Sequence, residues 1–97
     1  MKVLLGDAAK VELVNAIEWY ELQNEGLGRR FAQAIDITVK RLVLYPEISP
    51  TLVKDVRRAM VKGFPYGIIY SIKDEYIEIV SVAHSHRKPM YWEKRIK

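Results

Sequence analysis

The chain has 97 residues, 49% of them hydrophobic, and it contains no cysteine. This length supports one compact domain over residues 1–97, because a chain of this size can bury a single core but not two. Without cysteine, disulfide frameworks and thiolate metal sites are excluded, and a reducing cytoplasm is the expected compartment. No apolar run approaches the ~20 residues that cross a bilayer, and the N-terminus carries no signal-peptide pattern, so we expect no membrane association.

Positive charge is concentrated in the second half of the chain. Residues 1–53 carry six Lys or Arg against seven Asp or Glu, whereas residues 54–97 carry ten against five. A one-sided positive field favours an anionic partner, either nucleic acid or an acidic protein. The alternative is a basic surface that serves only solubility.

The N-terminal half predicts a strand followed by a helix. Residues 1–5 form a short apolar run that ends at Gly6, and Asp7 is expected to cap a helix over residues 8–24. The buried stripe of this helix is predicted at helical spacing, at Leu13, Ala16, Ile17 and Tyr20. Trp19 is expected in the core or in helix packing beside Tyr20.

A second helix is predicted over residues 27–44, ended by Pro46, because the residue before proline is displaced from helical geometry. Its apolar face is expected to comprise Leu27, Phe31, Ile35, Leu42 and Tyr45. The short link at residues 24–26 makes the two helices an antiparallel hairpin.

Three strands are predicted in the remainder. Residues 46–50 read as a loop, residues 54–61 as a strand, and Lys62 and Gly63 as a turn. The stretch 64–84 then forms an antiparallel hairpin whose first strand starts at Pro65, because two runs rich in Ile, Val and Tyr flank the polar residues 73–75. Strict alternation along the second strand would place four of its residues on the same face of the sheet: Ile77, Ile79, Ser81 and Ala83.

These elements predict an α+β fold of order β-α-α-β-β-β, with the helical hairpin on one face of an antiparallel sheet and a basic C-terminal tail. The opposite face cannot be wholly apolar and solvated. Where it meets Arg57, Arg58 and the tail, we expect the surface for a partner.

Three segments together resemble the RelE/ParE superfamily of type II toxin–antitoxin toxins, the plasmid-stabilisation type. They are AIEWYELQNEGLGRRF (16–31), VRRAMVKGFPYGIIY (56–70) and IVSVAHSHRKPMYWEKR (79–95). The resemblance implies a small bacterial toxin that arrests growth and is neutralised by a cognate antitoxin in a hetero-oligomer. RelE-like members cut messenger RNA in the ribosomal A site, as mRNA interferases, and ParE-like members poison DNA gyrase. A non-toxic antitoxin-binding remnant is a third possibility.

For RNA cleavage the resemblance implies catalytic roles without a metal or other cofactor. Arg57 or Arg58, together with Arg87, would stabilise the phosphate, and His86 or Tyr91 would transfer a proton. Pro89 and Trp92 are closer to the ParE branch, whose members need no catalytic residues. Nucleic-acid or target binding is assigned to the other basic and aromatic residues of this half: Lys54, Lys62, His84, Lys88, Trp92, Lys94 and Arg95.

Several of these residues have structural alternatives. Because Arg57 and Arg58 are successive on a strand, they point to opposite faces and only one can serve a given site, while the other is expected to pair with an acidic residue. His84 could instead hydrogen-bond a neighbouring backbone group. Tyr91 and Trp92 could anchor the tail on the sheet as large apolar side chains.

Overall fold

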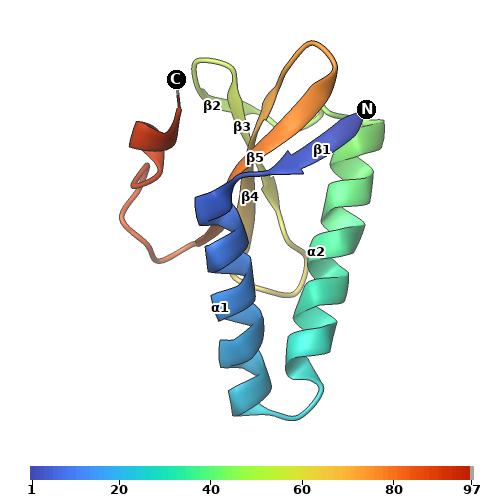
Figure 1. The fold of residues 1–97 in the computed structure, drawn as a ribbon, viewed down its shortest axis with the longest axis vertical. Helices are drawn as coiled ribbons and strands as arrows, with labels where there is room; N and C mark the ends of the chain where they lie inside the picture. Colours follow the sequence, from blue (N-terminus) through green and yellow to red (C-terminus); the bar gives the residue numbers. More distant parts are fainter. Residues whose placement is uncertain (97) are drawn as a thin grey trace.

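A helical hairpin and a five-stranded sheet make up the fold, which this computed structural model describes for residues 1–96 (Figure 1). In chain order the elements are β1 (Lys2–Leu5), α1 (Asp7–Gln23), α2 (Leu27–Leu44), β2 (Thr51–Val53), β3 (Val56–Met60), β4 (Tyr66–Ile72), β5 (Tyr76–His84) and the 3-10 helix η1 (Glu93–Arg95). The predicted α+β class is confirmed, and the second helix has the predicted bounds.

The sheet differs from the expected one in two respects. Its order is β1-β5-β4-β3-β2, and β1 runs parallel to β5, so the sheet is mixed and not purely antiparallel. The predicted strand over residues 54–61 is also wrong at its start. Lys54 adopts a left-handed φ of 51° in a turn, and the chain before it forms the edge strand β2, which pairs with β3.

The two helices are joined at a tight, charged corner. Gly26 has a φ of 85°, and the carboxylate of Glu21 accepts hydrogen bonds from the N–H groups of Gly26 and Gly28, at 2.9 and 3.0 Å. Glu21 thereby satisfies free donors at the start of α2. By contrast, the prediction that Asp7 caps α1 is wrong. Asp7 is the first helical residue, and Gly6 holds the cap position without a side-chain hydrogen bond.

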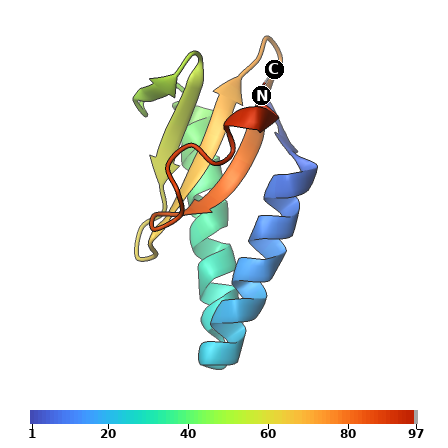
Figure 2. The same ribbon diagram turned by 90° about the vertical axis from the view of Figure 1, so that its left-hand side faces the viewer.

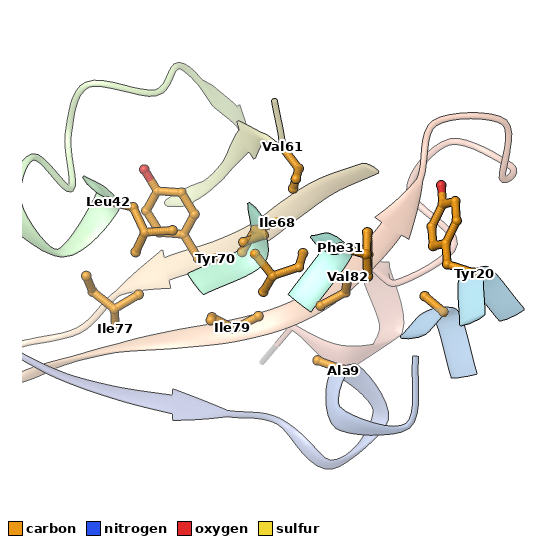
Figure 3. Close-up of a cluster of buried hydrophobic side chains, with 12 residues drawn as sticks. Ala9, Tyr20, Phe31, Leu42, Val61, Ile68, Tyr70, Ile77, Ile79 and Val82 are labelled. Atoms are coloured by element: carbon orange, nitrogen blue, oxygen red, sulfur yellow. The ribbon is translucent and has the colours of Figure 1, made fainter. Parts of the chain in front are cut away.

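The main core lies between the helices and the sheet. Figure 3 shows its side chains converging from α1, α2, β4 and β5, and the cluster includes Tyr20, Phe31, Leu42, Ile68 and Tyr70. The predicted stripe of α1 is confirmed, because Ala16 and Tyr20 are buried, and Leu13 and Ile17 pack against the cluster. Two expectations are wrong: the side chains of Trp19 and Tyr45 are 55% and 60% exposed.

A β-bulge interrupts the central hairpin. Ile69 pairs with Ser81 and Tyr70 pairs with Ile79, which leaves Val80 without a residue opposite. The extra residue reverses the alternation of β5, so Val82 joins the core on the helix side. The face predicted by strict alternation is therefore correct for Ile77 and Ile79 and wrong beyond Val80.

The second face of the sheet is covered by the C-terminal segment, residues 85–96. In Figure 2 this segment lies in front of β4 and β5, while α2 lies behind the sheet. Trp92 is only 3% exposed and packs with Val56, Ile69 and Val80, which confirms the interpretation of Trp92 as an anchor. No helix formed by residues 1–96 has the length and apolar character needed to cross a membrane.

Candidate functional site

A cleft of about 360 Å³ opens between β3, β4 and the C-terminal segment, and we call it the tail-side cleft. Its basic lining residues are Arg58, His84, Arg87 and Lys88, and its apolar lining includes Met60, Ile69, Met90 and Trp92. None of its lining residues is Asp or Glu. The cleft therefore combines an apolar floor with uncompensated positive charge.

Alternation along β3 and a glycine on β4 place Arg58 in this cleft. Arg58 lies opposite Ile69, one residue along from the pair of Ala59 and Ile68 that faces the helices. A Cβ added to Gly67 would lie 3.0 Å from Cγ of Arg58 and 3.1 Å from its Cδ. Glycine at position 67 thus lets the aliphatic part of Arg58 lie across β4, with its guanidinium in the cleft.

Arg87 lies at the boundary between two clefts. Its guanidinium carbon is 4.0 Å from the centroid of the Tyr91 ring, a cation–π contact. Besides the tail-side cleft, Arg87 lines a second cleft of about 380 Å³, the helix-side cleft, which α1 borders through Glu12, Asn15, Ala16 and Trp19. Tyr66, Val82, His84 and Tyr91 complete the helix-side cleft.

The rings of the two histidines contact each other edge-on just past the end of β5. The ring centroids of His84 and His86 are 5.0 Å apart, and Tyr66 contacts His84 edge-on at 5.0 Å. The backbone N–H of His86 donates to Nδ1 of His84 at 3.0 Å, so this nitrogen is an acceptor. The structural alternative for His84, a hydrogen bond to neighbouring backbone, is confirmed, and His84 lines the tail-side cleft as well.

A carboxylate on α1 binds the C-terminal segment. Oε1 of Glu12 accepts hydrogen bonds from Arg95 at 2.9 Å, Ser81 at 2.9 Å and the backbone N–H of Val82 at 3.1 Å. Its Oε2 accepts from the hydroxyl of Tyr91 and from the second guanidinium nitrogen of Arg95, the latter at 3.3 Å. This is a partly buried, charge-assisted network.

The network shifts the ionisation of two of its members. Burial acts to raise the pKa of Glu12, but the hydrogen bonds from Arg95, Tyr91, Ser81 and Val82 outweigh it and lower that pKa from its ordinary value of 4.5. The pKa of the Tyr91 hydroxyl is raised above 10.0, mainly by burial and then by its hydrogen bond to Glu12. Both shifts favour ionised Glu12 beside neutral Tyr91.

The predicted site residues separate into two groups. The structure brings six of them to the tail-side cleft: Arg58, His84, Arg87, Lys88, Tyr91 and Trp92. His86 adjoins this group through its edge-on ring contact with His84. The remaining five lie outside both clefts: Lys54, Arg57, Lys62, Lys94 and Arg95.

The expectation that Arg57 and Arg58 point to opposite faces is confirmed. Arg57 donates to the backbone carbonyls of Glu47 and Ser49, at 3.0 and 2.6 Å, so it fixes the loop before β2. The expectation that it pairs with an acidic side chain is therefore wrong. Carbonyl oxygens of the loop before β2 take that role, because they lie within hydrogen-bond distance of the guanidinium.

Sequence reasoning missed Glu12, together with Asn15 and Tyr66 of the helix-side cleft. A signal for Glu12 was present, because it lies three residues after buried Ala9 and four before buried Ala16, on the inner side of α1. An acid at such a position requires a partner. Its main partner, Arg95, is 83 residues away in sequence, so spacing could not identify it.

No three His, Cys, Asp or Glu side chains within residues 1–96 lie close enough together to hold a metal ion. The tail-side cleft instead presents cations, aromatic rings and apolar side chains. Such a set can bind an anionic or mixed apolar and acidic surface.

Comparison with protein families matches residues 3–89 of the 97 to the ParE toxin of the type II toxin–antitoxin system parDE. The chain belongs to the ParE toxin family. A solved structure, titled "Chromosomal ParDE TA system from P. aeruginosa", is similar to this chain with a TM-score of 0.63 and 16% identity, over 87% of this chain and 95% of that one. At this identity the likeness concerns the fold. Comparison with curated proteins gave no match.

Membership in the ParE family confirms the resemblance to the RelE/ParE superfamily that the three sequence segments indicated. The matched range contains α1, α2, every strand except the first residue of β1, and the start of the C-terminal segment. It therefore includes Glu12, Arg58, His84 and Arg87, whereas Tyr91 and Trp92 lie beyond it.

Proposed function

We propose that this chain is a growth-arresting toxin that binds a protein target, DNA gyrase in the manner of ParE-like toxins, through the tail-side cleft and without chemistry of its own. The observation that carries the proposal is that the cleft gathers cations over an apolar floor. One of the two proton-transfer candidates, the Tyr91 hydroxyl, is in addition hydrogen-bonded to Glu12.

Charge and exposure in the cleft fit a protein surface. Arg58, Arg87 and Lys88 are exposed, and the lining contains no acid to neutralise them. Met60, beside Arg58, is 55% exposed, which supplies apolar area for contact. Aromatic, Met and Arg side chains are enriched where protein interfaces are tightest. An acidic surface with apolar residues at its centre is the complement.

We also propose that a cognate antitoxin binds this chain and forms a hetero-oligomer with it. Membership in a family of toxin–antitoxin toxins and the similarity to the ParDE structure support this. The partner is expected to present an acidic or amphipathic segment that orders on binding, since the sheet half of the toxin carries the excess positive charge.

A second candidate function is ribosome-dependent cleavage of messenger RNA. It is favoured by one observation: Arg58, Arg87 and His84 line the same cleft, and the ring of His86 contacts that of His84 edge-on. Two cations and an imidazole are the groups that metal-free phosphodiester cleavage uses. In this reading Arg58 and Arg87 stabilise the phosphorane, and His86 transfers the proton.

One experiment separates the two functions. Purified toxin is added to a gyrase supercoiling and DNA-cleavage assay, and in parallel to translating ribosomes with mapping of messenger RNA 5′ ends. The gyrase reading expects trapped gyrase–DNA breaks and no codon-phased cuts. Arg58→Ala and Arg87→Ala should each weaken inhibition by about tenfold or more, as for cations near the centre of an interface.

The matched control is Lys10→Ala, which removes an exposed cation from α1 outside both clefts. It should inhibit gyrase as the unmodified toxin does. If the unmodified toxin makes codon-phased cuts that Arg87→Ala does not make, and if it leaves gyrase unaffected, messenger RNA cleavage is the function instead of gyrase inhibition. Full gyrase inhibition by both cleft variants would show that the target binds elsewhere.

A further inference from the structure

Glu12 is the polar connection between the helical hairpin and the C-terminal segment. Within residues 1–96, every hydrogen bond that joins α1 to residues 85–96 ends on this carboxylate, and the donors are Tyr91 and Arg95. The same carboxylate reaches β5 through Ser81 and Val82. One side chain thus joins three parts of the fold: the first helix, the last strand and the tail.

This connection extends to Arg87 through Tyr91. The Tyr91 hydroxyl is held at Glu12 and is 2.9 Å from Oγ of Ser81, which fixes the position of the ring. Arg87 lies 4.0 Å from the centroid of that ring. The guanidinium of Arg95 lies 5.3 Å from the same centroid, so the ring is placed between two cations. Displacing Tyr91 would remove the surface on which Arg87 rests.

We propose that Glu12 is a positioning residue for target binding: by holding Tyr91 and Arg95, it fixes the C-terminal segment so that Arg87 stands between the two clefts. The target-binding part of this inference rests on the proposed function, and the positioning of the segment does not. The carboxylate is suited to the task because it accepts five hydrogen bonds, three of them from side chains of a segment that has little regular structure.

The apolar anchor alone does not define the position of Arg87. Trp92 is buried against the sheet, but residues 85–89 between β5 and the anchor are all exposed. Their link to β4 is made by Ser85, whose N–H and hydroxyl donate to the carbonyl of Pro65 at 2.8 and 3.0 Å. Between Ser85 and Trp92, the N–H groups of His86 and Arg87 bond back to His84 at the end of β5. The attachment of this stretch to α1 is made by Tyr91, and it depends on Glu12.

The test compares Glu12→Ala and Arg95→Ala with the unmodified toxin by amide hydrogen exchange and by gyrase inhibition. Amides of residues 87–95 should exchange about tenfold or more faster in both variants, the size expected when charge-assisted hydrogen bonds are lost. Amides of β4 and α2 should exchange at unchanged rates, which a general loss of stability would not allow. The double variant should equal the more affected single variant, because both substitutions remove the same contact.

Arg95→Ala is the decisive variant for function. Arg95 lines neither cleft, so weaker gyrase inhibition by this variant, together with faster exchange in residues 87–95, would indicate an effect through the position of the segment. Glu18→Ala and Glu93→Ala are matched controls, since each removes an exposed acid, one from α1 and one from η1. Both should keep the exchange rates and the inhibition of the unmodified toxin.

The outcomes separate the two ideas. Unchanged exchange in residues 87–95 of both variants would overturn the positioning role of Glu12. Faster exchange with full gyrase inhibition would confirm that Glu12 holds the segment and overturn its role in target binding. If the unmodified toxin leaves gyrase unaffected, the proposed function fails, and the exchange data alone decide whether Glu12 positions the segment.

Discussion

Arg57 and Arg58 are adjacent on β3, yet one supports the fold and the other lines the tail-side cleft. Arg57 donates to the carbonyls of Glu47 and Ser49 in the loop between α2 and β2, whereas Arg58 extends over Gly67 on the opposite face. The pleat of the strand separates two chemically identical side chains into different environments. Substituting each in turn distinguishes stability from binding.

Arg57→Ala should lower the free energy of unfolding by about 1 to 2 kcal/mol, because two hydrogen bonds from a charged donor are lost. Arg58→Ala should change it by about 0.5 kcal/mol or less, as for an exposed side chain without structural partners. Urea denaturation followed by circular dichroism measures both. Equal losses in the two variants would contradict the assignment of Arg57 to the loop.

Much of the fold could be predicted because its signals are local. The spacing of apolar residues and Pro46 gave the bounds of α2, and the runs around residues 73–75 gave the β4–β5 hairpin. The parallel pairing of β1 with β5 could not be predicted, since it joins Lys2 to Tyr76 across most of the chain. The bulge at Val80 also lacks a sequence signal, because valine suits either face of a sheet.

The candidate site was predictable in its residue types and less so in its geometry. Residue type indicated Arg57 or Arg58 on a strand and Arg87 and Trp92 in the tail, and Arg58, Arg87 and Trp92 do meet at one cleft. Glu12 could not be paired from sequence, because its partner Arg95 approaches only after the tail has folded across the sheet. Exposure of Trp19 was also unpredictable, since helical spacing alone does not show where the sheet ends.

Gly28→Ala should destabilise the fold although alanine is the better helix former. An added Cβ would lie 2.7 Å from the carbonyl oxygen of Ile17 and 3.0 Å from Oε1 of Glu21, so the helices would have to separate. Overpacking of this kind costs about 1 to 3 kcal/mol, which exceeds the helix-propensity gain of about 1 kcal/mol. Thermal unfolding should show a lower Tm than for the control Gln33→Ala, an exposed position of α2. An unchanged or raised Tm would contradict this close packing.

Tyr70→Phe should lower the free energy of unfolding by about 1 kcal/mol without altering the core. Tyr70 is fully buried, and its hydroxyl donates to the carbonyl of Pro46 at 2.7 Å, which ties the loop after α2 to the sheet. The ring would keep its packing, so the loss reports the hydrogen bond. Denaturant titration measures it, with Tyr45→Phe as control because the Tyr45 side chain is 60% exposed.

Ionisation of Glu12 should make stability depend on pH at the acid end. Because its folded pKa is lowered from 4.5, its contribution is complete above the unfolded value and is lost as the pH falls through the folded pKa. Glu12→Gln removes this ionisation. The difference in unfolding free energy between the unmodified protein and this variant should therefore be largest at neutral pH and shrink below pH 4.5. The pKa of Asp55 is also lowered, because its carboxylate accepts a hydrogen bond from Ser71. The contribution of Asp55 to the pH dependence is measured separately with Asp55→Asn.

At alkaline pH the dependence of stability on pH has the opposite direction, and it comes from Tyr91. Its folded pKa is raised above 10.0, so its contribution is complete below that value and is lost as the pH rises through the folded pKa. Tyr91→Phe should remove this loss, and Tyr45→Phe should not, since Tyr45 is an exposed tyrosine on the loop after α2. Urea unfolding between pH 7 and pH 11 measures the effect. Equal alkaline destabilisation in the unmodified protein and Tyr91→Phe would show that the Tyr91 hydroxyl is not held by the Glu12 carboxylate.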